Sequence, residues 1–152
     1  MAEVSINQAS FSLSRTINAS VERVYKAFAD KDSKEKWFKG PGSETESHTM
    51  DFKVGGRESS SGKFPDGVTH RLEAIYLDIV PSKRIIYAYE MYLNDKKISV
   101  SLATVEFQAT GDQTQLTLSE SDVFLESGDN LQQRQQGTQD LLETLIKSLK
   151  EN

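Results

Sequence analysis

The segment from Asn130 to Lys150 predicts one long amphipathic α-helix, and it limits what the rest of the chain can form. Residues at steps of three and four share one side of a helix. That side here carries Leu131, Arg134, Thr138, Leu141, Leu142, Leu145, Ile146 and Leu149. The opposite side carries Gln132, Gln136, Asp140, Glu143, Lys147 and Lys150. An isolated helix of this length is marginal in water, so it needs a surface on which to pack.

The segments before this helix predict that surface to be a β-sheet. Residues 9–17 alternate between apolar and polar side chains, as in a half-buried strand. Two short helices follow, one containing Val21 to Phe28 and one at 33–38. Six strand-like segments come next, at 43–54, 57–63, 68–80, 84–93, 98–108 and 115–124. The short turns between them predict an antiparallel meander, and hence an α+β fold with the long helix on one concave face.

Composition restricts the functional classes. The 152 residues indicate a single domain, 1–152, with a core at about 9–150. A net charge of −5 argues against a nucleic-acid partner. The absence of cysteine excludes disulfides, thiolate zinc sites and a cysteine nucleophile. No apolar segment is long enough to cross a membrane and no signal peptide is evident, so we expect a cytoplasmic protein without a membrane partner.

Several motifs resemble the helix-grip superfamily of START-like (SRPBCC) domains. They are residues 17–30, Lys36-Trp37-Phe38, Asp51-Phe-Lys-Val-Gly-Gly56, Pro65-Asp-Gly67 and residues 76–86. Within that superfamily they look like the family named after the activator of heat-shock-protein-90 ATPase, in its C-terminal-like domain. The resemblance implies a curved antiparallel sheet wrapped around the long C-terminal helix, with two short helices after the first strand. It also implies a fold that hosts carriers, cyclases and co-chaperone domains.

The chain departs from the family pattern at three positions. Lys53 stands in the aspartate and double-glycine signature where an arginine is common, and Ala74 replaces a common glycine. The family's C-terminal helix usually carries Gly-Trp where this chain has Gly137-Thr138. A threonine in place of tryptophan leaves more room beneath the helix.

A pocket between sheet and helix is predicted from the strand at 84–93. Alternation places Ile85, Tyr87, Tyr89, Met91 and Leu93 on one face. Buried tyrosine hydroxyls need partners or water, which favours a cavity over a plain core. The predicted pocket residues are Trp37, Phe38, His48, Met50, Phe52, Tyr87, Tyr89, Met91, Val100, Leu102, Thr138, Leu142, Leu145 and Ile146, with Ile98 on the same wall.

Other motifs are interpreted more plainly. Trp37-Phe38 is either a lid over the pocket or a plug of the core, and a lone aromatic pair favours the plug. Asp51 and Lys53 are expected to form an outward-facing pair. His48 and His70 are the only histidines, and their spacing to carboxylates matches no metal site, so we expect no metal and no cofactor.

The leading functional hypothesis is non-enzymatic binding of a small hydrophobic or amphipathic ligand. One alternative is a protein-interaction module with a chaperone-type protein partner, as the family name implies. A second is a cyclase- or hydrolase-like enzyme with His48 or Glu90 as the base. A homodimer is a further hypothesis, because the strand at 68–80 is apolar on both faces: Ile75, Leu77 and Ile79 against Leu72, Ala74 and Tyr76.

Overall fold

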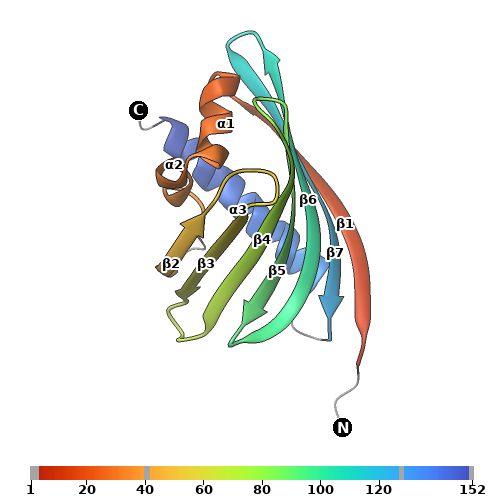
Figure 1. The fold of residues 1–152 in the computed structure, drawn as a ribbon. Helices are drawn as coiled ribbons and strands as arrows, with labels where there is room; N and C mark the ends of the chain where they lie inside the picture. The colour runs from red at the N-terminus through yellow and green to blue at the C-terminus, as the bar shows by residue number, and fades with distance from the viewer. Residues whose placement is uncertain (1–3, 40–41, 127–128, 151–152) are drawn as a thin grey trace.

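The computed structural model describes residues 4–39, 42–126 and 129–150, which form seven strands and three helices (Figure 1). In chain order the elements are β1 (Ile6–Ile17), α1 (Val21–Ala29), α2 (Lys31–Glu35), β2 (Glu44–Met50), β3 (Arg57–Lys63), β4 (Thr69–Val80), β5 (Arg84–Leu93), β6 (Lys96–Thr110), β7 (Gln113–Leu125) and α3 (Leu131–Lys150).

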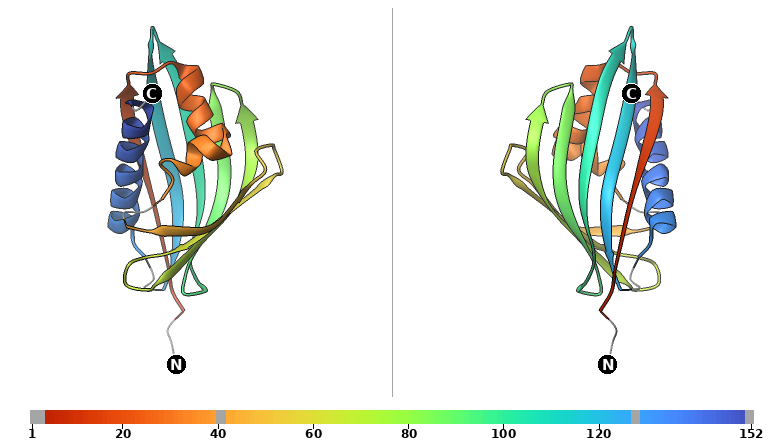
Figure 2. Two further views of the ribbon diagram at one scale, coloured as in Figure 1. Left: turned by 90° about the vertical axis from the view of Figure 1, so that its left-hand side faces the viewer. Right: turned by 90° about the vertical axis from the view of Figure 1, so that its right-hand side faces the viewer.

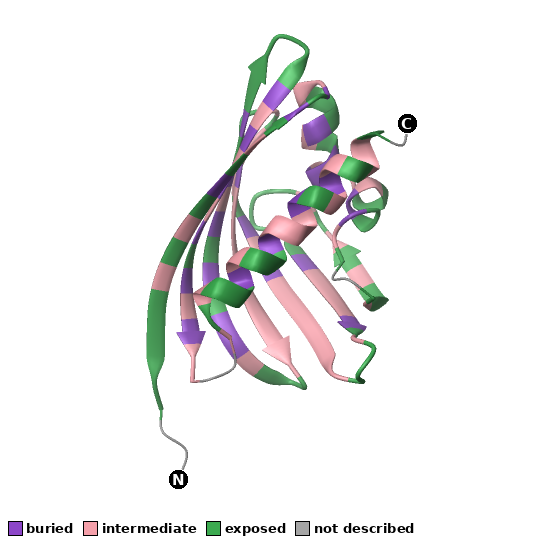
Figure 3. Cartoon of the chain, turned by 180° about the vertical axis from the view of Figure 1, so that it is seen from behind, coloured by how far each residue is buried: buried purple, intermediate pink, exposed green. Residues whose placement is uncertain are grey.

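The strands form one antiparallel sheet in the order β1-β7-β6-β5-β4-β3-β2. Strands β2 to β7 follow one another as hairpins, and β1 joins the far edge by pairing with β7. The sheet curves, and α3 crosses its concave face with α1 and α2 at one end of the same face (Figures 2 and 3). The predicted helix-grip α+β fold is therefore confirmed.

Strands β3 and β5 have the predicted bounds, whereas β6 and β7 are longer at both ends. The second helix begins and ends earlier than predicted, at Lys31 and Glu35. Strand β2 was predicted to continue to Val54, but it ends at Met50. The chain turns after Met50, where Gly56 N–H donates to the Lys53 carbonyl at 2.8 Å, and this leaves Val54 exposed. None of the described helices combines the length and the apolar character needed to cross a membrane.

The turn between β2 and β3 explains the paired glycines of the signature. A Cβ atom on Gly56 would lie 2.1 Å from the Asp51 carbonyl oxygen, which no side chain tolerates, whereas a Cβ on Gly55 would meet nothing within 4 Å. Gly55 instead has a positive φ of 84°. Asp51 and Lys53 are exposed and lie 3.7 Å apart, as expected of an outward-facing pair. The signature thus has a structural role here.

This geometry predicts unequal effects of two neighbouring substitutions. Gly56→Ala forces two backbone segments apart, so we expect the free energy of unfolding to fall by about 3 kcal/mol. Gly55→Ala only places a side chain at positive φ and should cost about 1 kcal/mol. Urea denaturation of both variants measures the difference. Equal losses of unfolding free energy in the two variants would show that the backbone at Gly56 accommodates a Cβ atom at no extra cost.

The apolar core fills the end of the sheet where α1 lies. Its buried members include Val24, Phe28, Tyr76, Ile85, Val105, Phe107, Leu116, Leu142 and Leu145. Along β5, Ile85 belongs to this core, but the inward residues from Tyr87 to Leu93 line a cavity. The fold therefore separates a packed end from a hollow end under the same helix.

The outer face of the sheet has no helix on it in the described part of the chain (Figure 2). On β4, Leu72, Ala74 and Tyr76 face inward, and Leu77 is 47% exposed on the other side. Ile79 was expected on the side of Leu77 but packs against the core, because β4 has a bulge between Tyr76 and Asp78. Apolar residues on both faces of β4 were the basis for expecting a homodimer. That expectation stays a prediction.

Candidate ligand-binding cavity

A cavity of about 390 Å³ lies between the concave face of the sheet and α3. Most of its lining is apolar or aromatic: Phe28, Trp37, Phe38, Phe64, Leu72, Tyr87, Tyr89, Met91, Leu93, Ile98, Leu118, Leu141 and Leu142. Its polar lining includes Lys34, Ser60, His70, Glu120, Arg134 and Thr138. A mainly apolar wall with a few fixed polar groups is typical of a small-molecule site.

Seven of the predicted pocket residues line this cavity: Trp37, Phe38, Tyr87, Tyr89, Met91, Thr138 and Leu142. The interpretation of Trp37 as a plug fits its surroundings, because its side chain is buried and its indole N–H donates to the Ala27 carbonyl at 2.9 Å. The same ring also forms part of the cavity wall. Ligand contact by these residues stays a prediction.

The other predicted pocket residues lie elsewhere. Met50, Phe52 and Ile146 pack against the core, and Leu145 belongs to it, so these four are outside the cavity lining. Val100 and Leu102 were wrongly placed, since they are 41% and 46% exposed on the outer face. The cause is a β-bulge, in which Met91 pairs with Ser99 but Tyr92 pairs with Lys97. The bulge leaves Ile98 unpaired against the cavity and reverses the alternation that the sequence suggested.

One buried polar cluster surrounds Glu58 of β3, whose side chain is 2% exposed. The Lys34 ammonium donates to one carboxylate oxygen at 2.7 Å, and the Tyr76 hydroxyl donates to the same oxygen. The other oxygen lies 2.8 Å from His48 Nε2. Burial alone would raise the pKa of Glu58, but the charge of Lys34 and these donors outweigh it and lower the pKa.

His48 was also predicted to line the pocket, but it lies outside the cavity lining and links this cluster to the surface. Its Nδ1 lies 2.7 Å from Glu35, a carboxylate whose pKa is lowered by that bond. Ionised carboxylates only accept hydrogen bonds, so both ring nitrogens of His48 must donate. His48 therefore has no free nitrogen with which to act as a base. Glu90, the other candidate base, lies on the outer face and pairs with Lys97.

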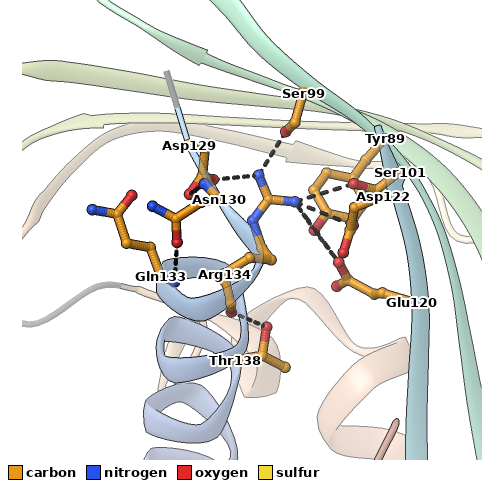
Figure 4. Close-up of polar contacts among 10 residues, drawn as sticks. All are labelled: Tyr89, Ser99, Ser101, Glu120, Asp122, Asp129, Asn130, Gln133, Arg134 and Thr138. Atoms are coloured by element: carbon orange, nitrogen blue, oxygen red, sulfur yellow. Dashed lines mark hydrogen bonds and ion pairs between the residues drawn. The ribbon is translucent and has the colours of Figure 1, made fainter. Parts of the chain in front are cut away.

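A second buried cluster surrounds Arg134 near the start of α3 (Figure 4). The guanidinium is 8% exposed and donates to the hydroxyls of Tyr89, Ser99 and Ser101 at 2.9, 2.6 and 3.1 Å. It also donates to Asp129 at 2.7 Å and to Asp122 at 3.5 Å. One side chain of α3 thus joins the helix to β5, β6 and β7.

Glu120 belongs to this second cluster and lines the cavity. It accepts a hydrogen bond from the Tyr89 hydroxyl at 2.8 Å, and its side chain is 4% exposed. Burial, followed by the neighbouring Asp122, raises the pKa of Glu120 to about 8, although Arg134 opposes the shift. Glu120 is therefore mainly protonated at neutral pH. The proton gives Asp122 a donor, and Asp122 Oδ2 otherwise has no hydrogen-bond partner among the described residues.

Two donors on the cavity wall retain unused capacity. The Lys34 ammonium has Glu58 as its one hydrogen-bond partner in the described ranges, and its nitrogen lies 4.5 Å from the centre of the Phe38 ring. The Tyr87 hydroxyl forms no hydrogen bond with any described residue. His70, which also lines the cavity, contacts Ser43 at 2.6 Å, and the centre of its ring lies 4.5 Å from that of Phe64. Burial lowers the pKa of His70. The described residues contain no group of histidine and carboxylate side chains arranged to hold a metal ion.

Sequence reasoning did not find Glu58, Glu120 or Arg134 as members of polar clusters. A signal existed for Glu120 and Asp122, because alternation places both on the face of Leu116 and Leu118. Carboxylates on an apolar face are unusual and indicate a buried network. Glu58 gave no such signal, since its strand is rich in serine and has no apolar face.

Comparison with known proteins agrees with the fold. Residues 18–151 match the family described as "Activator of Hsp90 ATPase homolog 1-like protein". No match was found among curated proteins. An uncharacterised protein from Rhizobium leguminosarum is 36% identical with a TM-score of 0.94, the alignment covering 99% of this chain and 100% of that one.

Two further solved structures are similar. Mll3558 from Rhizobium loti is 39% identical with a TM-score of 0.86, over 95% of this chain and 99% of that one. DynU16, from the dynemicin biosynthetic locus, shares the fold at 16% identity and a TM-score of 0.67, over 93% of this chain and 47% of that one. The family match spans nearly the whole chain, and the protein belongs to the family of activator of Hsp90 ATPase homolog 1-like proteins.

Proposed function

We propose that this protein is a non-enzymatic binding protein for a small, mainly apolar molecule, held in the cavity under α3. The observation that carries the proposal is the cavity itself, with about 390 Å³ of space behind aromatic and aliphatic walls. Sites for small molecules begin at about 300 Å³. Protein interiors otherwise contain few voids larger than a water molecule, and each void costs stability. A space of this size and lining is better explained by a ligand than by imperfect packing.

The polar groups support binding over catalysis. Glu58, His48 and Arg134 are engaged in hydrogen bonds with other protein groups, which fixes their orientation and leaves none of them free to take a proton from a ligand. Of the two candidate bases, Glu90 lies on the outer face of the sheet, and both ring nitrogens of His48 are hydrogen-bonded to carboxylates. Such groups shape a cavity and orient an occupant, which is what a carrier or sensor requires.

A tryptophan at Thr138 tests the proposal. Thr138 lines the cavity and is 7% exposed, so Thr138→Trp projects an indole into the space. We expect wild-type protein to bind the neutral fluorescent probe N-phenyl-1-naphthylamine, and the variant to bind it at least about tenfold more weakly because the larger side chain excludes it. Fluorescence titration measures both affinities.

Gln132→Trp is the matched control, since Gln132 is an exposed position of the same helix. It should bind the probe like wild type. Equal binding by Thr138→Trp and wild type would place the probe outside the cavity and contradict the proposal. Native mass spectrometry of freshly purified protein adds a direct search for a retained ligand. If the protein carries none and no apolar probe binds, the interaction-module alternative becomes the better explanation, and a pull-down with chaperone-type partners follows.

A further inference from the structure

Lys34 places a positive charge on the cavity wall, whereas its ion-pair partner Glu58 lies outside the cavity lining. We propose that the ligand is a small amphipathic anion, whose charged oxygen group contacts the Lys34 ammonium and the Tyr87 hydroxyl while its apolar body lies against Leu72, Met91 and Ile98. This inference rests on the proposed function and specifies the chemistry of its ligand. Its argument comes from the distribution of buried charge around the cavity.

The first step is the charge of the Glu58 cluster. A single carboxylate, Glu58, accepts from both Lys34 and His48, at 2.7 and 2.8 Å. The two oxygens of Glu58 are therefore divided between Lys34 and His48, and Lys34 has only one of them. Glu35 compensates His48 from the outer side, where its side chain is 39% exposed. Lys34 lines the cavity and Glu58 does not, so the charged group of this cluster that faces the cavity is the Lys34 ammonium.

The second step is the opposite charge of the Arg134 cluster. The guanidinium of Arg134 is shared by Asp122 and Asp129, at 3.5 and 2.7 Å, so two carboxylates surround one cation. Glu120 is mainly protonated near neutral pH and adds little further charge. This side of the cavity repels an anion, whereas the Lys34 side attracts it. The two clusters therefore give an anionic ligand one preferred orientation.

The third step is the Tyr87 hydroxyl, which lines the cavity and has no protein partner among the described residues. Burial raises the pKa of Tyr87 well above its ordinary value, so the hydroxyl keeps its proton. A protonated hydroxyl donates readily to an anionic oxygen. The centre of the Tyr87 ring lies 6.0 Å from the Lys34 nitrogen, so the two side chains border the same part of the cavity.

A pair of fluorescent probes tests the proposal. 1-Anilinonaphthalene-8-sulfonate and N-phenyl-1-naphthylamine share one ring system and differ by a single sulfonate. We expect wild-type protein to bind the sulfonate more tightly. Lys34→Met should weaken sulfonate binding about tenfold to hundredfold, the range of a lost charge-assisted hydrogen bond, and change binding of the neutral probe less than about twofold.

Lys36→Met is the matched control, because it removes the same charge from an exposed position outside the cavity lining. Tyr87→Phe removes only the hydroxyl and leaves no protein partner unpaired. It should weaken sulfonate binding about threefold to tenfold and leave the neutral probe unaffected. Lys34→Met removes the cation beside Glu58 and could prevent folding. In that case the sulfonate affinity of Tyr87→Phe tests the anion proposal by itself.

The outcomes separate the two proposals. Binding of both probes with equal affinity, unchanged by Tyr87→Phe and equal in the two lysine variants, overturns the anion proposal and leaves the apolar-ligand proposal intact. If neither probe binds folded wild-type protein, both proposals are overturned. Sulfonate binding that Lys36→Met weakens as much as Lys34→Met locates the anion on the surface and also overturns the inference.

Discussion

Replacing Arg134 with methionine is expected to lower the free energy of unfolding by about 4 kcal/mol. Methionine replaces the aliphatic part of the arginine side chain but carries no charge and cannot donate a hydrogen bond, so Asp122 and Asp129 lose their buried cation. The hydroxyls of Ser99 and Ser101 lose a partner at the same time. Breaking a buried ion pair from one side costs more than the pair contributes, because the remaining charge stays out of water. Urea denaturation at neutral pH measures the loss.

Arg15→Met is the control, because the Arg15–Glu143 pair is a surface contact at 3.4 Å with side chains 30% and 66% exposed. Surface pairs contribute at most about 1 kcal/mol. Adding Asp122→Asn to Arg134→Met removes one of the stranded charges, so the double variant should recover part of the loss. A loss for Arg134→Met no larger than that for Arg15→Met would mean that the cluster does not hold α3 on the sheet.

The position of Arg134 shows how far the sequence could be interpreted. Helical spacing places Arg134 on the inward side of α3, and the structure confirms this. Its partners could not be found in the same way, because they come from three strands whose register is a property of the whole sheet. Ser99 and Ser101 face inward because of the bulge opposite Met91 and Tyr92. A single extra residue in a strand leaves no clear sequence signal and exchanges the faces of all that follow.

The strand at 84–93 was easier to interpret. Its alternation holds from Ile85 to Met91, and the structure places Tyr87, Tyr89 and Met91 on the cavity wall as expected. The burial of Lys34 could not be predicted from the sequence, since a lysine in a short charged helix usually faces water. Lys34 is buried because α2 lies against the end of the concave face, and this depends on tertiary packing. The fold and the apolar wall therefore follow from local pattern, whereas the partners of the buried charges do not.

Stability should depend on pH through Glu120 in a direction opposite to that of most carboxylates. The folded pKa of about 8 lies above the ordinary value of 4.5, so between these values the folded protein holds a proton that the unfolded chain releases. The stabilisation is complete below pH 4.5 and is lost as the pH rises through about 8, at a slope of up to about 1.4 kcal/mol per pH unit. Glu120 thus favours the folded state most strongly in mild acid, where its buried carboxyl group is protonated.

Glu120→Gln isolates this effect, because glutamine accepts from Tyr89 and donates towards Asp122 as the protonated acid does. The lowered pKa of His70 acts in the opposite direction below pH 6.5, but it is common to both proteins and cancels in their difference. We therefore expect the stability of Glu120→Gln relative to wild type to rise by about 3 kcal/mol between pH 5.5 and pH 7.5, measured by urea denaturation. Glu106→Gln, at an exposed position, should show a difference that is constant with pH. The same constant difference for Glu120→Gln would mean that Glu120 is ionised in the folded protein, and the cavity would then carry an extra negative charge.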